Sequence, residues 1–178
     1  MPALDGTLCR LRLYDAGDVE AVRMLADDFM VARWMTRAFP HPYTRRDAQR
    51  WIAIATRGRD GWYYAIEVDG ALAGGIGIDL YEGERDGCAA FGYWLGRPYW
   101  GRGIATDAAR TLSDHALSSD RLRRLEARVF AQNVASARVL EKSGFHLEAR
   151  LRDFYLDRDD KVCDALSFAR LATAPSHA

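Results

Sequence analysis

The chain has 178 residues, of which 49% are hydrophobic and 28% charged, which is typical of one folded domain with a substantial core. Its 25 basic and 25 acidic side chains cancel, which argues against direct nucleic-acid or anionic-membrane binding through a basic excess. The sequence has neither a signal-peptide pattern nor an apolar run near the ~20 residues of a membrane helix, so we predict a cytoplasmic protein with no membrane partner.

The first third of the chain predicts one strand and the first of two helices. Apolar and polar residues alternate over Leu8–Leu13, which indicates a strand. Asp15 and Asp18 are typical of a helix start, and apolar residues then recur at helical spacing as far as Phe29. An irregular stretch follows.

A second helix is predicted after Thr44, which forms a capping pair with Asp47. Its apolar stripe includes Trp51. Trp51, Trp34 and Phe39 are interpreted as core or cleft wall rather than as substrate-reading residues.

From Trp62 onward the pattern changes to strands, with an Asp69-Gly70 pair that suits a two-residue hairpin turn. The remaining predicted strands and helices are, in chain order, strands Trp62–Val68, Ala71–Leu80 and Ala89–Leu95, helix Ile104–Leu117, strand Arg124–Phe130, helix Val134–Ser143 ending at Gly144, a strand from Phe145 with one buried face, and strand Val162–Leu171. Residues 173–178 are expected to form a flexible tail.

This order predicts a single α/β domain with a mixed, mostly antiparallel seven-stranded sheet and about four helices. The fourth and fifth strands, Ala89–Leu95 and Arg124–Phe130, are joined by a helical crossover and should be parallel. Cys9, Cys88 and Cys163 lie far apart without metal or redox spacing, so we expect three reduced thiols and no metal site.

The most informative segment connects the fourth strand to the following helix through Gly101-Arg102-Gly103. Glycines let an anion approach the backbone, and the unpaired N–H groups at a helix start favour phosphate. The same pattern also occurs in a plain tight connection. The loop lacks the third glycine of a dinucleotide fingerprint and the Gly-Lys-Ser/Thr of a nucleotide-binding P-loop.

Two separated runs carry a family resemblance. Trp100-Gly101-Arg102-Gly103-Ile104-Ala105 resembles the acyl-CoA pyrophosphate loop of the GNAT N-acetyltransferases, and the run from Asn133 to Phe145 resembles their second motif. Within that superfamily the chain is most similar to the bacterial ribosomal-protein N-terminal acetyltransferases. Supporting runs are Pro40-His41-Pro42-Tyr43-Thr44, Phe91-Gly92-Tyr93-Trp94-Leu95 and the closing hairpin with Asp164. The resemblance implies a GNAT-like acyl-CoA N-acetyltransferase domain over residues 5–172, with the fourth and fifth strands splayed.

The resemblance also implies a binding site for acetyl-CoA as cosubstrate. The backbone of Tyr93, Trp94 and Leu95 would pair with the pantetheine arm. Backbone N–H groups of Arg102, Gly103, Ala105 and Thr106 would hold the pyrophosphate, with the Thr106 hydroxyl as an extra donor. Gly101 and Ile104 of the same loop are also expected to be cofactor-binding residues. Asn133 would contact the middle of the cofactor, or merely cap the following helix. Lys142 or Arg138 would lie near the outer phosphate, or be solvated helix charges.

The implied reaction is direct attack of a primary amine on the acetyl thioester in a ternary complex. The proton-donating tyrosine of many relatives is replaced by Leu140, and Ser136 is the expected substitute. The glutamate that often serves as base is replaced by Ala90; Asp79, Glu82, Glu84 or a water relay are alternatives, although Glu82 and Glu84 also suit a solubilising loop.

Because the sequence offers no evident general base, the acceptor amine should be one that loses its proton easily. Deprotonating an α-amine with a pKa near 8 costs about 1.4 kcal/mol at pH 7, and a lysine side chain costs about 4.6 kcal/mol. We therefore expect a peptide or protein N-terminal α-amine, or a small-molecule amine of modest basicity. The alternative is an acyl-CoA-binding sensor or partner module with little catalysis. The apolar final strands suggest a possible homodimer.

Overall fold

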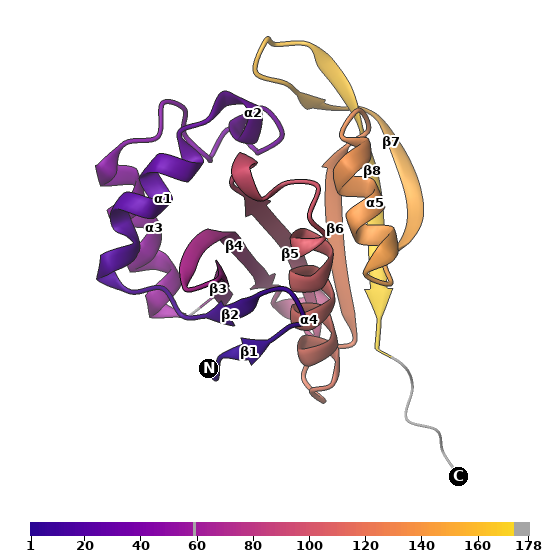
Figure 1. The fold of residues 1–178 in the computed structure, drawn as a ribbon. Coiled ribbons are helices and arrows are strands. Elements are labelled where there is room, and N and C mark those ends of the chain that lie inside the picture. The colour runs from indigo at the N-terminus through magenta and orange to yellow at the C-terminus, as the bar shows by residue number, and fades with distance from the viewer. Residues whose placement is uncertain (59, 173–178) are drawn as a thin grey trace.

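The computed structural model describes residues 1–58 and 60–172, and these form one twisted sheet with helices on both faces (Figure 1). The sheet order is β1-β2-β3-β4-β5-β6-β8-β7. The strands are β1 (Leu4–Asp5), β2 (Arg10–Arg12), β3 (Gly61–Val68), β4 (Ala71–Leu80), β5 (Cys88–Leu95), β6 (Arg124–Phe130), β7 (His146–Leu156) and β8 (Val162–Leu171). The helices are α1 (Val19–Ala26), α2 (Phe29–Ala32), α3 (Arg45–Arg57), α4 (Ile104–Leu117) and α5 (Val134–Lys142). The tail expected over 173–178 lies outside the described residues.

The predicted α/β domain with a mixed sheet is confirmed, and the sheet has eight strands rather than seven. The added strand, β1, pairs with β2 through Leu4 and Leu11. The strand predicted over Leu8–Leu13 is shorter than expected. Its first part is a loop in which the N–H groups of Leu8 and Cys9 donate to the carboxylate of Asp107 on α4, at 2.7 and 3.2 Å. These N–H groups bind a side chain instead of a neighbouring strand.

The helix predicted to run to Phe29 ends at Ala26, which gives five helices instead of about four. Asp28 causes the break, because its carboxylate accepts a hydrogen bond from the Met30 N–H at 2.8 Å and caps a separate short helix, α2. Three other local predictions are confirmed: the Thr44–Asp47 capping box begins α3, Asp69 and Gly70 both have positive φ in the β3–β4 turn, and Gly144 ends α5 at φ 85°.

The strand predicted from Phe145 with one buried face was wrong in part. Phe145 is buried but precedes β7, whereas Leu147 is 52% exposed. A bulge between Leu147 and Ala149 shifts the register against β8, so the simple alternation is lost. As the outer strand of the sheet, β7 is packed on fewer sides than its neighbours.

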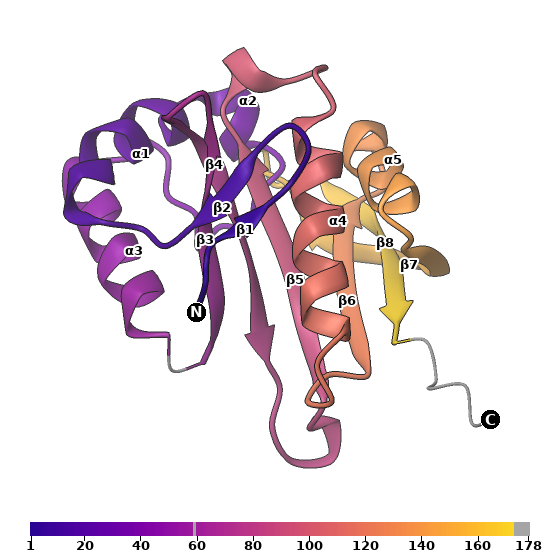
Figure 2. The same cartoon turned by 60° about the horizontal axis from the view of Figure 1, so that its bottom comes forward.

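Two apolar layers hold the domain together. Helices α4 and α5 cover one face of the sheet, and α1 and α3 cover the other (Figure 2). Leu112 of α4 and Leu125 of β6 belong to the first layer, and Val22 of α1 and Ile52 of α3 belong to the second. The described helices all fall short of the length and apolarity that a bilayer crossing requires.

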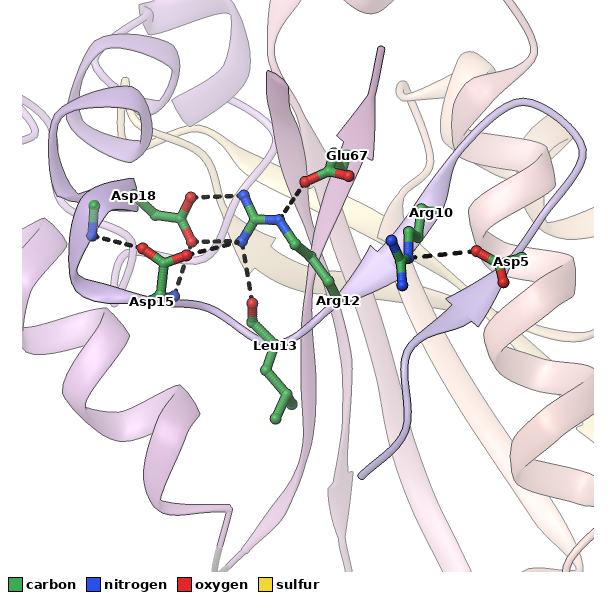
Figure 3. A network of polar contacts seen from close by, with 8 residues as sticks. Asp5, Arg10, Arg12, Leu13, Asp15, Asp18 and Glu67 are labelled. Atoms are coloured by element: carbon green, nitrogen blue, oxygen red, sulfur yellow. Dashed lines mark hydrogen bonds and ion pairs between the residues drawn. The ribbon is translucent and has the colours of Figure 1, made fainter. Parts of the chain in front are cut away.

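An arginine fixes the start of the first helical segment to the sheet (Figure 3). The Arg12 guanidinium donates to both carboxylate oxygens of Asp18, at 2.7 and 2.8 Å, and also contacts Glu67 on β3. Burial opposes ionisation of Asp18, but the hydrogen bonds from Arg12 hold the pKa of this carboxyl below its ordinary value. The ion pair therefore joins β2, β3 and the α1 start.

The parallel pairing of β5 with β6 is short. It covers only Cys88–Ala90 against Arg124–Glu126. Beyond it, β5 stays paired with β4 as far as Leu95, and β6 stays paired with β8 as far as Phe130. The two strands thus separate toward their carboxyl ends (Figure 1), which is the position that ligands favour in open α/β sheets.

Candidate active site

A cleft of about 560 Å³ opens where β5 and β6 separate. Its walls come from the carboxyl-terminal half of β5, the middle of β6, the start of α4, the start and inner face of α5, and the segment from Val31 to Thr36. The residues that the sequence placed at the site and that line this cleft are Tyr93, Trp94, Leu95, Gly101, Gly103, Ile104, Ala105, Thr106, Asn133, Ser136 and Lys142. The fold therefore brings both sequence motifs to one cavity.

The main-chain groups of β5 that face the cleft are those of Tyr93 and Leu95. The Gly96 N–H donates to the Ala73 carbonyl of β4 at 2.8 Å. Because hydrogen-bonding directions alternate along a strand, Trp94 also faces β4, and Tyr93 and Leu95 face the side that β6 has left. This side of β5 is an open strand edge inside the cleft.

Trp100 holds the loop after β5 against the end of that strand. Its indole N–H donates to the Leu95 carbonyl at 2.7 Å, so one acceptor of the open edge is already used within the chain. A 3₁₀ turn over Arg97–Tyr99 connects the two residues. Trp100 consequently determines where the glycine loop begins.

The loop enters α4 with two glycines in left-handed conformations, Gly101 at φ 73° and Gly103 at φ 79°. Gly103 is the N-cap residue and no side chain caps this helix, in contrast to α3 and α5. The first-turn N–H groups and the positive end of the helix dipole are thus directed to the cleft, where Ala105 and Thr106 also lie. This is the chemistry of an anion site.

Arg102 is the one predicted cofactor residue that is absent from the cleft lining formed by the described residues. Its guanidinium carbon lies 5.9 Å from the centre of the Tyr99 ring. The sequence analysis assigned only the backbone N–H of Arg102 to the site, so the position of its side chain outside the cleft lining does not contradict that assignment.

On the opposite wall, Asn133 caps α5. Its side-chain oxygen accepts a hydrogen bond from the Ser136 N–H at 3.2 Å, and the residue also lines the cleft. The structural alternative considered for Asn133 is thus present, and it leaves the residue within the cavity. Arg138 and Lys142 lie further along the same helix and line the cleft as well.

A hydroxyl pair bridges the two walls. The Tyr93 hydroxyl and Ser136 Oγ share a hydrogen bond of 2.9 Å between β5 and α5. Burial raises the pKa of Tyr93 to about 12, an effect that the Ser136 contact partly opposes. The phenol therefore stays protonated at neutral pH and can donate to Ser136. The sequence analysis considered only the backbone of Tyr93, although its place beside Leu95 on the same strand face pointed to this wall.

The other positions considered for the acid and the base lie in separate parts of the fold. Leu140 is fully buried in the core, so no polar group occupies that position. Glu82 and Glu84 lie at the other end of β5, in the β4–β5 loop. Asp79, which pairs in register with Ala90, accepts a hydrogen bond from the Tyr63 hydroxyl.

The charged residues among the described cleft-lining side chains are all basic: Arg128, Arg138 and Lys142. Glu126 of β6 lies near this wall, but Arg85 and Arg124 bind its carboxylate at 2.6 and 2.8 Å. Burial opposes ionisation of Glu126, yet these two arginines lower its pKa below the ordinary value, which makes it a weak base. The described residues hold no cluster of His, Cys, Asp or Glu suited to a metal ion.

The aromatic residues of the N-terminal half divide between core and cleft. Trp34 lines the cleft, whereas Trp51 and Phe39 pack against the layer between the sheet and α1 and α3. Both outcomes are within the sequence interpretation of these residues as core or cleft wall.

Residues 7–146 match the family described as "Acetyltransferase (GNAT) domain". The chain is 38% identical over 100 residues to the uncharacterised N-acetyltransferase p20 of Bacillus licheniformis, covering 56% of this chain and 55% of p20. It is 31% identical over 121 residues to the ribosomal-protein-serine acetyltransferase of Escherichia coli, covering 67% of this chain and 66% of the relative. The matches thus span between about half and two thirds of the length of these relatives.

Among solved structures, RimJ of Mycobacterium smegmatis in complex with CoA-disulfide superposes with a TM-score of 0.80 at 28% identity. The alignment covers 96% of this chain and 86% of RimJ. The fold is therefore shared over almost the whole described chain.

Proposed function

The chain belongs to the acetyltransferase (GNAT) family, and we propose that it transfers the acetyl group of acetyl-CoA to a primary amine, specifically an α-amine. The observation that carries this proposal is the single cleft that joins the glycine loop at the uncapped start of α4 to the Tyr93–Ser136 hydroxyl pair. One end suits a pyrophosphate, and the other suits a proton transfer.

The residues present fit acetyl-CoA. The N–H groups of the loop and first turn, from Gly101 to Thr106, would hold the pyrophosphate, and Arg138 or Lys142 would lie near the outer phosphate. The open edge of β5 at Tyr93 and Leu95 would pair with the pantetheine amides as if they belonged to an added strand.

Acetyl-CoA supplies an acetyl group already activated as a thioester. The Leu95 N–H, at the end of the open edge, would polarise the carbonyl that the amine attacks. The Ser136 hydroxyl would donate the proton that the departing sulfur takes up, and the Tyr93 hydroxyl would orient Ser136 and restore its proton. The proton that the amine nitrogen loses as the amide forms would pass through water to refill this hydroxyl pair, so that proton gain at sulfur and proton loss at nitrogen balance. This assigns Ser136 as the catalytic residue and Tyr93 as its positioning partner.

The all-basic lining supports an amine that loses its proton easily. An α-amine with a pKa near 8 costs about 1.4 kcal/mol to deprotonate at pH 7, against about 4.6 kcal/mol for a lysine side chain. The name of the E. coli relative, ribosomal-protein-serine acetyltransferase, also describes transfer to serine.

One observation favours a different class, a module that binds acyl-CoA without turnover. Leu140 occupies the family's usual proton-donor position and is buried in the core. Release of free CoA, measured with a panel of α-amines, lysine-like amines and polyamines, separates the two functions. Turnover on α-amines supports the enzyme. Thermal stabilisation by acetyl-CoA without CoA release on any amine supports the binding module.

A further inference from the structure

Resting on the proposed function, we infer that the acceptor carries a carboxylate close to its reactive amine, and that Arg128 binds this carboxylate. The inference depends on the side of the cleft that the acetyl-CoA assignment leaves without a ligand.

Arg128 is a cation with an incomplete set of partners. It lines the cleft from β6, and its side chain is 41% exposed. Its carboxylate neighbour, Glu126, is 3.9 Å away and is already bound more closely by Arg85 and Arg124. The planar guanidinium fork of Arg128 is therefore free to bind a carboxylate with two parallel hydrogen bonds.

Arg128 lies on the opposite face of the sheet from Arg138 and Lys142. Ala127 and Val129 of β6 pack into the layer under α4 and α5, so Arg128 between them faces away from it. The phosphates of acetyl-CoA account for the α5 cations and the glycine loop. The positive charge of Arg128 therefore has no phosphate to neutralise it, and it lies on the side from which an acceptor would enter.

Aromatic rings in contact with one another connect Arg128 to Trp34 of the cleft lining. The Arg128 guanidinium carbon lies 5.7 Å from the Phe154 ring centre. The chain of ring contacts continues from Phe154 to Tyr155 at 5.0 Å, to Phe130 at 4.7 Å and to Trp34 at 6.1 Å. Such a wall suits a small or apolar group beside a charge that an arginine binds.

The entrance is held in place by the tip of the β7–β8 hairpin, which reaches toward α2 (Figure 1). The Arg158 guanidinium donates to the carbonyls of Ala32 and Phe39 at 2.8 and 2.6 Å. The wall that carries Trp34 and the wall that carries Tyr155 are thereby fixed relative to each other. The cleft wall that Trp34 shares with Arg128 is therefore tied to the hairpin tip.

Charge also excludes an acceptor with a second cation. A polyamine would place its other ammonium groups beside Arg128 with no carboxylate among the described lining residues to balance them. An acceptor with a carboxylate near the amine reverses this repulsion. Either a free amino acid or a peptide with an acidic residue near its N-terminus has this chemistry.

Two matched acceptor pairs test the inference on the full chain with saturating acetyl-CoA. Comparing serine with serinamide shows whether an α-carboxylate is recognised. Comparing Ser-Glu-Ala-amide with Ser-Gln-Ala-amide shows whether an acidic side chain near the N-terminus of a peptide is recognised. Each is measured with wild-type protein, Arg128→Gln, Arg128→Lys and the control Arg57→Gln, which removes an exposed charge at the end of α3. Calorimetric binding of each acceptor to the CoA-saturated protein is measured in parallel, so that the preference is also read without turnover.

We expect wild-type protein to prefer the carboxylate member of at least one pair by about tenfold, in KM and in binding, and Arg128→Gln to abolish that preference. Arg128→Lys should restore part of it, and Arg57→Gln should leave it unchanged. Intrinsic amine reactivity cancels when the wild-type and variant ratios are compared. The pair that responds identifies a free amino acid or an acidic peptide as the source.

Equal use and equal binding of both members of both pairs would overturn the inference, as would a preference that survives Arg128→Gln or a faster reaction with spermidine. Failure of the proposed function has a different signature, namely no CoA release with any amine. In that case the binding measurements alone decide whether Arg128 recognises a carboxylate.

Discussion

The hydroxyls of Tyr93 and Ser136 lie 2.9 Å apart and join β5 to the first turn of α5 across the cleft. Tyr93 comes from the supporting run Phe91–Leu95 and Ser136 from the second family-like motif, and the fold makes them hydrogen-bonding partners. Both residues line the cleft and are half-buried, and the roles proposed for them differ: Ser136 would donate the proton and Tyr93 would support it.

Replacing these hydroxyls should lower turnover to different extents. We expect Ser136→Ala to lower kcat by about 10²-fold or more, and Tyr93→Phe by about tenfold, because only Ser136 would meet the departing sulfur. The double variant should be no worse than Ser136→Ala, since both act in one proton transfer. Steady-state kinetics measures this. Tyr64→Phe is the matched control, because its buried hydroxyl has no partner among the described residues.

The pH profile should reflect the acceptor and not the protein. The rate constant kcat/KM should rise toward pH 8 as an α-amine with a pKa of about 8 loses its proton. The pKa of Tyr93 is raised to about 12, so the phenol keeps its proton and no descending limb should follow below pH 11. A limb that falls between pH 7 and 9 in wild-type protein, but not in Tyr93→Phe, would contradict this assignment.

The left-handed glycine loop can be tested with a matched pair. Gly101 (φ 73°) and Gly70 (φ 77°) have similar conformations, and an added Cβ meets no heavy atom within 4 Å at either position. Gly101→Ala and Gly70→Ala should therefore lower the free energy of unfolding by a similar amount, about 1 kcal/mol.

Only Gly101→Ala should weaken acetyl-CoA binding, by about tenfold, because Gly70 is in the β3–β4 turn and does not belong to the glycine loop. Urea denaturation and calorimetric titration measure the two effects separately. Equal acetyl-CoA affinity in the two variants would show that the loop conformation does not serve the cofactor.

The ion pair of Arg12 with Asp18 should stabilise the fold in a pH-dependent way. Arg12→Met should lower the free energy of unfolding at pH 7 by about 2 kcal/mol, less than for a fully buried pair because Arg12 is partly exposed. Arg12→Lys, which loses the paired hydrogen bonds, should have an intermediate effect.

The sign of the pH effect follows from Asp18, whose pKa is lowered in the folded state. Its stabilisation is complete above the unfolded value near 3.9 and is lost as the pH falls through the lower folded value. The difference between wild-type and Arg12→Met in urea denaturation should therefore shrink as the pH is lowered below the unfolded value of about 3.9. A difference independent of pH would assign the effect to packing of the arginine stem.

Local chemistry in the sequence predicted most of the fold. The Thr44–Asp47 cap, the Asp69-Gly70 turn and the glycine after α5 each fix a backbone conformation within a few residues, and all three form as expected. The helix break at Asp28 was missed, because its carboxylate has to be recognised as a cap in the middle of an apolar pattern that continues to Phe29.

Long-range contacts account for what the sequence could not show. The loop at Leu8 is not a strand because Asp107, about a hundred residues away, binds its N–H groups. The Tyr93–Ser136 hydrogen bond and the unbalanced charge of Arg128 likewise depend on which faces of β5, β6 and α5 meet. The motifs predicted the glycine loop and the start of α5 that line one part of the cleft, and the part around Arg128 required the three-dimensional arrangement.

The most direct test of the account is to titrate acetyl-CoA into isotope-labelled protein and follow the backbone amide signals. We predict that the signals of Gly101, Gly103, Ala105 and Thr106 shift most, together with those of Tyr93 and Leu95 on the open strand edge. Saturation with acetyl-CoA that leaves these amide signals unchanged, or that shifts signals outside the cleft most, would contradict the assignment of this loop as the binding site of the coenzyme.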